Sequence, residues 1–145
     1  MTQLATDLRP AYIRLDGQAI HAYNEPAFRY FLTLERNRAR RSVRPLLLAL
    51  VKLRTDAETE PDAVARTFAT IFSALNTCVR EVDFVGWYRE GNVVGAVLAS
   101  GGGTIANLRQ NVSARVVAAL MTRLSPIEAK RLRVRVVYVG ATPRI

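Results

Sequence analysis

Residues 46–53, with the sequence LLLALVKL, decide the fold. Seven of these eight residues are apolar, and a short run of this kind is typical of a central β-strand that is covered on both faces. Pro45 stands directly before the run and ends the helical pattern that precedes it. We therefore predict a buried strand at residues 46–53, with a layer of structure against each of its faces.

Downstream of this strand, helical and strand spacing alternate along the chain. The predicted elements are a helix at 61–79, a strand at 82–88, a hairpin turn at 89–92, a strand at 93–99, a helix that ends near 124, and a strand at 132–139. The inward positions of the two helices are Val64, Phe68, Ile71 and Leu75, then Ile105, Leu108, Val112, Val116 and Leu120.

The order of strand, helix, strand, strand, helix and strand is the ferredoxin-like arrangement. It predicts an α/β (α+β) fold, in which an antiparallel sheet with a βαββαβ core carries its helices on one face. The chain has 145 residues, with no internal repeat and no linker long enough to divide it. Residues 1–145 are therefore predicted to form a single domain.

An extra N-terminal helix is predicted at residues 25–42, with Asn24 as its N-cap and Pro26 in its first turn. Because the strand at 46–53 has no polar face, we expect this helix or a partner to cover the second face of the sheet. We also predict a homodimer that uses residues 25–42. The helix is predicted to carry an apolar stripe of Ala27, Tyr30, Phe31 and Leu34, and a basic ridge of Arg29, Arg36 and Arg40.

The remaining N-terminal residues, 1–24, are predicted to be an arm or a hairpin, since an Asp16-Gly17 pair there suits a tight turn. They show no secretory signal pattern, and no run of about 18 uncharged apolar residues exists to span a membrane. The lone cysteine, Cys78, cannot form an internal disulfide and is predicted to be a small core residue. These features together favour a cytoplasmic location.

The chain is strongly basic, with a net charge of +9, and 19 of its 21 basic residues are arginine. Arginine binds phosphate-bearing partners well, but an ordinary solvated surface accounts for the same charge. Polyanion or nucleic-acid binding through arginine-rich faces is therefore one alternative. An RNA-binding domain that stacks bases is disfavoured, because the strands at 46–53 and 93–99 contain no aromatic residue.

Few residues of this sequence suggest catalysis. His21 is the only histidine, which excludes a structural zinc site built with the single cysteine. The segment at residues 100–104, Ser-Gly-Gly-Gly-Thr, lacks the spacing of a phosphate-binding P-loop and is predicted to be a plain turn. No catalytic residue is predicted from these patterns.

Two stretches of the sequence resemble a known family. Residues 34–46, LERNRARRSVRPL, resemble the segment that leads into the first strand of GGDEF (diguanylate-cyclase-type) domains. Residues 80–88, REVDFVGWY, resemble the lead-in to the signature turn of those domains. The resemblance implies a nucleotide-cyclase-like fold over residues 28–139. The Gly-Trp-Tyr at 86–88 is also similar to small cyclase-fold proteins associated with exopolysaccharide biosynthesis, which implies a role in that process.

The same resemblance implies that this chain has lost cyclase activity. GGDEF cyclases hold two metal ions with Asp residues at the end of the first strand and with an acid in the signature turn. Lys52 and Arg54, or their neighbours, stand where those Asp residues would be, and a cation repels a metal ion. A degenerate GGDEF domain implies a non-catalytic regulatory or scaffolding protein, without a metal or another cofactor. Four residues replace the Gly-Gly-acid-acid turn: Arg89, Glu90, Gly91 and Asn92.

One feature of the family is kept, the RxxD pattern of Arg80 and Asp83. It lies five residues before the signature turn, the spacing at which cyclases carry their inhibitory site for cyclic di-GMP. The resemblance implies a cyclic di-GMP receptor, with Arg80 and Asp83 as ligand-binding residues and with Arg89 or Arg109 to complete the anion site. A structural reading stays open, because an arginine favours a helix C-terminus and an aspartate favours the start of a turn.

Overall fold

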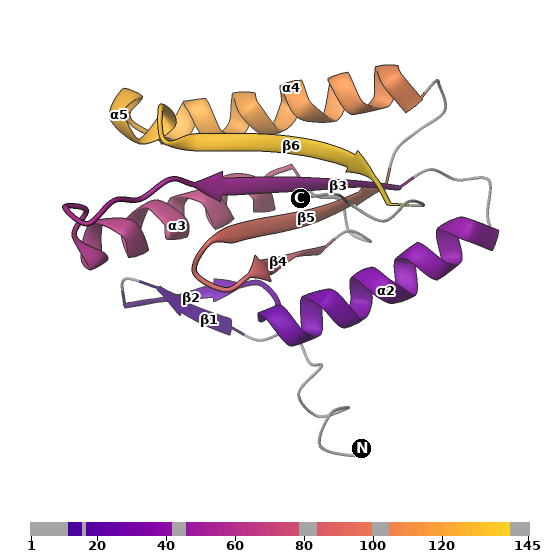
Figure 1. Cartoon of the computed structure of the whole chain (residues 1–145), viewed down its shortest axis with the longest axis horizontal. Helices are drawn as coiled ribbons and strands as arrows, with labels where there is room; N and C mark the ends of the chain where they lie inside the picture. Colours follow the sequence, from indigo (N-terminus) through magenta and orange to yellow (C-terminus); the bar gives the residue numbers. More distant parts are fainter. Residues whose placement is uncertain (1–11, 16, 42–45, 79–83, 100–104, 140–145) are drawn as a thin grey trace, which may run out of the picture.

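The computed structural model describes residues 12–15, 17–41, 46–78, 84–99 and 105–139 (Figure 1). The elements are β1 (Tyr12–Leu15), β2 (Gln18–His21), α2 (Glu25–Arg41), β3 (Leu46–Leu53), α3 (Pro61–Asn76), β4 (Phe84–Arg89), β5 (Val93–Ala99), α4 (Ile105–Arg123), α5 (Pro126–Ala129) and β6 (Leu132–Tyr138). Pro45, which was predicted to end the preceding helix, lies outside the described residues.

The main sheet has four antiparallel strands in the order β4-β5-β3-β6 (Figure 1). Strand β3 is therefore an interior strand, and its bounds are the predicted 46–53. The strand order confirms the ferredoxin-like fold class, and β1 and β2 form a separate hairpin as predicted. The last residue of that turn, Gly17, has φ +74°, a conformation that glycine adopts without strain.

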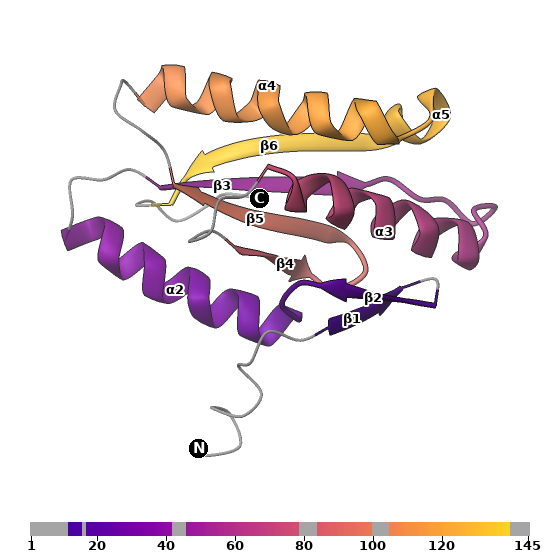
Figure 2. The same cartoon turned by 180° about the vertical axis from the view of Figure 1, so that it is seen from behind.

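The first face of the sheet is covered by α3 and α4 (Figure 2). Residues 47, 49, 51 and 53 of β3 point into this layer and are buried. Trp87 of β4 packs edge-on against Phe68 and Phe72 of α3, with ring centroids 4.9 and 5.0 Å apart. The predicted inward positions of both helices lie in this core wherever their side chains are described, with Val64 only half-buried.

The second face carries the alternate residues of β3 and is covered in part by α2, as expected from the apolar strand. Phe28 and Leu32 of α2 are buried there together with Leu48 and Leu50. The Phe28 ring lies over Gly86 and Gly95, which are directly opposite each other on β4 and β5. These two residues have no side chain, so the helix can approach the sheet closely.

The predicted apolar stripe of α2 is wrong in part. Ala27 is buried, but Tyr30 and Leu34 are 42% and 36% exposed, whereas Phe28, Leu32 and Ala39 are buried. The helix is rotated by about one residue from the predicted orientation, because the glycine pair on the sheet accepts the ring of Phe28. Its N-cap is confirmed, since the Asn24 Oδ1 accepts a hydrogen bond from the Ala27 N–H at 3.0 Å.

The short helix α5 was not predicted. Ser125 and Glu128 form a capping box, in which each side chain accepts a hydrogen bond from the other residue's backbone N–H. The Glu128 Oε2 also accepts a hydrogen bond from the Thr67 hydroxyl at 2.7 Å, which ties α5 to α3. The Ser-Pro-Ile-Glu sequence at 125–128 contains this signal.

Glu128→Gln should lower the melting temperature at pH 7, and the difference should shrink as the pH falls. The Ser125 N–H, and after it the Thr67 hydroxyl, hold the pKa of the Glu128 carboxyl below its ordinary value. A pKa that is lower in the folded state gives stability that is present above the unfolded value, about 4.3, and is lost as the pH drops through the folded value.

Melting curves between pH 7 and pH 3 check this expectation. Glu60→Gln is the matched control, because the Glu60 side chain makes no capping hydrogen bond at the start of α3. If Glu128→Gln lowers the melting temperature as much at pH 3 as at pH 7, the carboxylate charge has no role in stability.

Candidate functional site: a cationic cavity beside the signature turn

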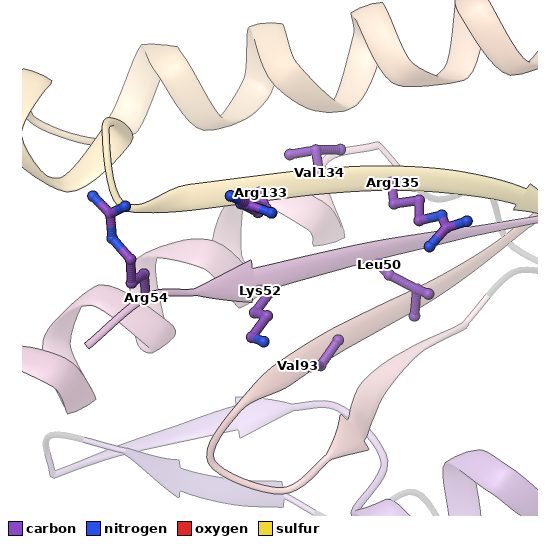
Figure 3. A pocket seen from close by; sticks show the side chains of 7 residues that line it. All are labelled: Leu50, Lys52, Arg54, Val93, Arg133, Val134 and Arg135. Carbon is purple, nitrogen blue, oxygen red and sulfur yellow. The ribbon is translucent and has the colours of Figure 1, made fainter. Parts of the chain in front are cut away.

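A cavity of about 530 Å³ lies over the end of β3 and the start of β6, where α2 does not cover the sheet (Figure 3). Its lining comes from β3, β5 and β6 and from the residue that follows β3. Apolar side chains and cations share it: Leu50, Val93 and Val134 with Lys52, Arg54, Arg133 and Arg135. None of these seven residues is acidic.

The strand register brings three of the cations together on one face. Lys52 is directly opposite Arg133, and Leu50 is directly opposite Arg135. Residues that are opposite in an antiparallel pair share a face, with Cβ atoms about 5 Å apart. Like charges at this distance repel one another, which destabilises the pair. An anion in the cavity would relieve this repulsion, whereas a metal ion would add to it.

No salt bridge neutralises these cations within the described chain. Both of its ion pairs lie in α2, between Arg29 and Glu25 and between Arg38 and Glu35. Within the same residues, no three His, Cys, Asp or Glu side chains come close enough to hold a metal ion. The cationic side chains of the cavity can therefore bind an anion. They do not fit a magnesium ion, because magnesium takes oxygen ligands.

The predicted signature turn lies next to this cavity. Its hairpin is closed by a hydrogen bond from the Asn92 N–H to the Arg89 C=O at 3.0 Å, and Gly91 has φ +76°. The Leu53 N–H approaches the Asn92 C=O at 3.5 Å, so the turn stands beside the end of β3. The structure thus brings together the two regions that the sequence singled out, the end of β3 and the hairpin.

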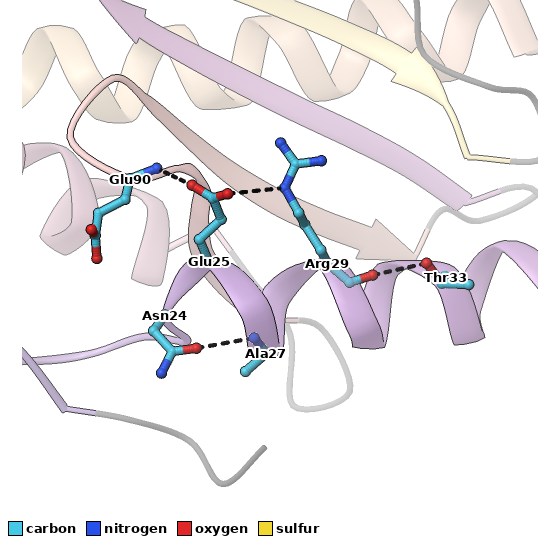
Figure 4. Close-up of polar contacts among 6 residues, drawn as sticks. All are labelled: Asn24, Glu25, Ala27, Arg29, Thr33 and Glu90. Carbon is cyan, nitrogen blue, oxygen red and sulfur yellow. Dashed lines mark hydrogen bonds and ion pairs between the residues drawn. The ribbon is translucent and has the colours of Figure 1, made fainter. Parts of the chain in front are cut away.

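The one acid in this turn, Glu90, does not line the cavity. Its backbone N–H donates a hydrogen bond to the Glu25 carboxylate, which also pairs with Arg29 (Figure 4). The Glu90 carboxylate itself points away from that contact. Arg29 in turn lies 4.6 Å from the centre of the Tyr88 ring, a cation–π contact. These contacts fasten the first turn of α2 to the hairpin.

The predicted ligand residues Arg80 and Asp83 lie outside the described residues, and their role stays a prediction. Arg89 and Arg109 are placed at opposite edges of the sheet, since Arg89 ends β4 whereas Arg109 of α4 donates to the Val136 C=O of β6 at 3.3 Å. At most one of these two arginines can belong to any single site.

The prediction that Cys78 is a small core residue is confirmed. Cys78 is buried, and its thiol approaches the backbone C=O groups of Ala74 and Arg115. Trp87 and Tyr88 are buried core residues, so neither is available to stack a nucleobase. Among the described residues, no helix combines the length and the apolar character needed to cross a membrane.

Two cavity residues, Arg133 and Arg135, were not among the predicted site residues, although the predicted strand at 132–139 contains both. Their alternation with Leu132, Val134 and Val136 did contain the signal, because it places both arginines on one face. The alternation does not give the register between β3 and β6, and this register places Arg133 directly opposite Lys52.

Comparisons with known proteins find similarity in structure alone. No protein-family model and no curated protein matches the chain. A diguanylate cyclase (DGC) protein from Thermotoga maritima is 18% identical, with a TM-score of 0.61 over 81% of this chain and 79% of its own. A sensory box/GGDEF family protein from Caulobacter crescentus is 14% identical, with a TM-score of 0.65 over 82% of this chain and 80% of its own.

The diguanylate cyclase SiaD from Pseudomonas aeruginosa, solved in complex with its activator SiaC, is 23% identical, with a TM-score of 0.61. The match covers 95% of this chain and 53% of SiaD. At these identities the similarity concerns the fold. It agrees with the nucleotide-cyclase-like arrangement implied by residues 34–46 and 80–88. This chain has the fold of the GGDEF domains of diguanylate cyclases.

Proposed function

We propose that residues 1–145 form a single degenerate GGDEF-like domain with a non-catalytic, regulatory or scaffolding role in the bacterial cytoplasm. The observation that carries the proposal is the charge of the cavity at the end of β3. Among the described residues, four cations and no carboxylate line it, and Lys52 and Arg54 stand where the family resemblance puts metal-binding Asp residues. On the resemblance of residues 86–88 we assign the protein to exopolysaccharide production.

The chemistry of cyclisation explains why this charge matters. Metal-dependent phosphoryl transfer uses Mg²⁺ to neutralise the phosphate charge and to orient the attacking group, and Mg²⁺ needs hard oxygen ligands. An ammonium or a guanidinium group cannot act as such a ligand. Lys52 and Arg54 can still bind the phosphates of a nucleotide, but they cannot hold the ions that activate it.

The purified chain should form no cyclic di-GMP from GTP with Mg²⁺ or Mn²⁺, because none of the described residues that line the cavity has a carboxylate to hold either ion. Chromatography of the reaction mixture checks this, with an active GGDEF cyclase under the same conditions as the positive control. Product that is formed by this chain and lost in Glu90→Gln would overturn the proposal, because Glu90 would then be a metal ligand.

Polyanion binding is the second candidate function, and it is favoured by the cavity cations, which form no salt bridge with any described residue. A homodimer through residues 25–42 also stays a proposal, for which Tyr30 and Leu34 are the exposed apolar side chains of α2. A cyclic di-GMP receptor through Arg80 and Asp83 is a further proposal, which rests on the RxxD pattern alone.

A further inference from the structure

Strand β6 is an edge strand, and half of its backbone groups point away from the sheet. Hydrogen bonds from Arg54 N–H to Arg131 C=O (2.8 Å) and from Val139 N–H to Leu46 C=O (2.7 Å) fix which residues face β3. Since hydrogen-bonded positions alternate along an antiparallel pair, the outward groups belong to the even-numbered residues 132, 134, 136 and 138.

Most of these outward groups lack a partner within the described chain. The Val136 C=O accepts the long hydrogen bond from Arg109 Nε, while the N–H and C=O of Val134 bond to no other described residue. A carbonyl oxygen has two lone pairs, so the contact with Arg109 leaves room for a second donor. The middle of β6 is therefore open to pairing with another strand.

A groove of about 710 Å³ runs beside this open edge, between β6 and α4. The groove is open where α4 carries two small side chains, Ser113 and Ala114, and Val117 gives it an apolar wall. Across from them lie residues 134–136 of β6. A backbone that paired with β6 would enter this groove with the side chains of one of its faces.

The charges around the groove indicate which kind of segment it would bind. Arg109 and Arg135 line it, none of its described lining residues is acidic, and Arg133 is the next residue along β6 on the same face as Arg135. A second copy that paired edge to edge would bring these arginines against their own equivalents, which is the arrangement that charged edge strands prevent. A segment with carboxylates would pair with them instead.

We propose that the open edge of β6 binds an extended acidic segment of a partner protein, which adds to the sheet as a fifth strand. Strand geometry fixes the pattern of that segment, because successive residues alternate between the two faces. Residues on the face of Arg133 and Arg135 are acidic, with carboxylates about 6.8 Å apart along the strand. The alternate residues are small and apolar, to fit beside Ser113 and Ala114.

A labelled peptide of about ten alternating Glu and Val residues is the probe, and fluorescence anisotropy with the full chain at physiological salt is the measurement. Two matched peptides separate the causes of binding. One has the same composition with all Glu in one block and all Val in another, and the other is the alternating peptide with N-methylated amides that cannot donate to β6. We expect both changes to weaken binding by about tenfold or more. The block peptide no longer matches its side chains to the two faces of the sheet, and the N-methylated peptide lacks the N–H donors that pair with β6.

Two variants test the position of the site. Arg135→Glu should weaken binding by about tenfold or more, while Arg40→Glu, the same charge change on an exposed residue of α2, should have a small effect. Ser113→Trp should block the groove without a change of charge. Melting curves confirm that each variant is folded.

Three kinds of result would overturn the proposal. One is equal binding of the alternating and the block peptide, which would show attraction to the net charge of the chain alone. Another is undiminished binding of the N-methylated peptide or of the Ser113→Trp variant. The third is no binding of the alternating peptide at high micromolar concentration. None of these results bears on cyclase activity, so this proposal is tested independently of the proposed function.

Discussion

Phe28→Ala should lower the free energy of unfolding by about 3–5 kcal/mol, the range for removing a buried aromatic ring. Phe28 has no exposed surface, and its ring packs edge-on against Phe84 and Tyr88 at 5.3 and 6.5 Å. It is also the side chain that lies over the glycine pair, Gly86 and Gly95. Its loss leaves a cavity between α2 and the sheet that neighbouring side chains cannot fill without moving the helix.

Denaturant unfolding of the two proteins measures this difference, with Tyr30→Ala as the control. Tyr30 lies two residues further along α2 and is 42% exposed, so its loss should cost well under half as much. The comparison also decides how α2 is oriented. A larger cost for Tyr30→Ala than for Phe28→Ala would mean that the helix packs through the stripe predicted from the sequence.

The main sheet could be predicted well from the sequence because its strands carry strong local signals. The run at 46–53 is apolar on both faces, and the glycine at 91 marks the hairpin between β4 and β5. These features depend on a few neighbouring residues. The order of elements then leaves few topologies, of which the ferredoxin-like arrangement is one.

The orientation of α2 could not be predicted in the same way. Helical spacing fits both Ala27, Tyr30, Phe31 and Leu34 and a second set that begins at Phe28, because aromatic residues stand close together in this helix. The choice between them is made by Gly86 and Gly95, which lie about sixty residues away in the chain. A contact of this kind is absent from any local pattern.

The candidate site was predictable in its charge but not in its full composition. Lys52 and Arg54 stood out because they end the central strand, where the resemblance implies acids. Arg133 and Arg135 joined them only through the pairing of β3 with β6. The groove beside β6 was not predicted at all, since it depends on how far α4 stands from the edge of the sheet.

Gly95→Ala should destabilise the protein by about 1–3 kcal/mol, and Phe28→Ala should remove most of that cost. A Cβ on Gly95 would lie 2.6 Å from Phe28 Cζ and 2.8 Å from Phe28 Cε2, closer than real side chains approach. The ring cannot move aside, because it is buried between α2 and the sheet. Once the ring is absent, the nearest atom to the added methyl group is the Tyr88 Cβ at 3.3 Å, and alanine is otherwise better than glycine in a strand by about 0.5–1 kcal/mol.

The four proteins of this double-mutant cycle should therefore give a coupling energy above about 1 kcal/mol between Phe28 and Gly95, measured by denaturant unfolding. Gly91→Ala is the control, since no atom lies within 4 Å of its added Cβ and its cost comes from the positive φ of the turn. That cost should be the same with and without Phe28, because the turn is formed by its own four residues. If Gly95→Ala also costs the same in both backgrounds, then Phe28 does not occupy the space over the glycine pair, and another contact holds α2 against the second face.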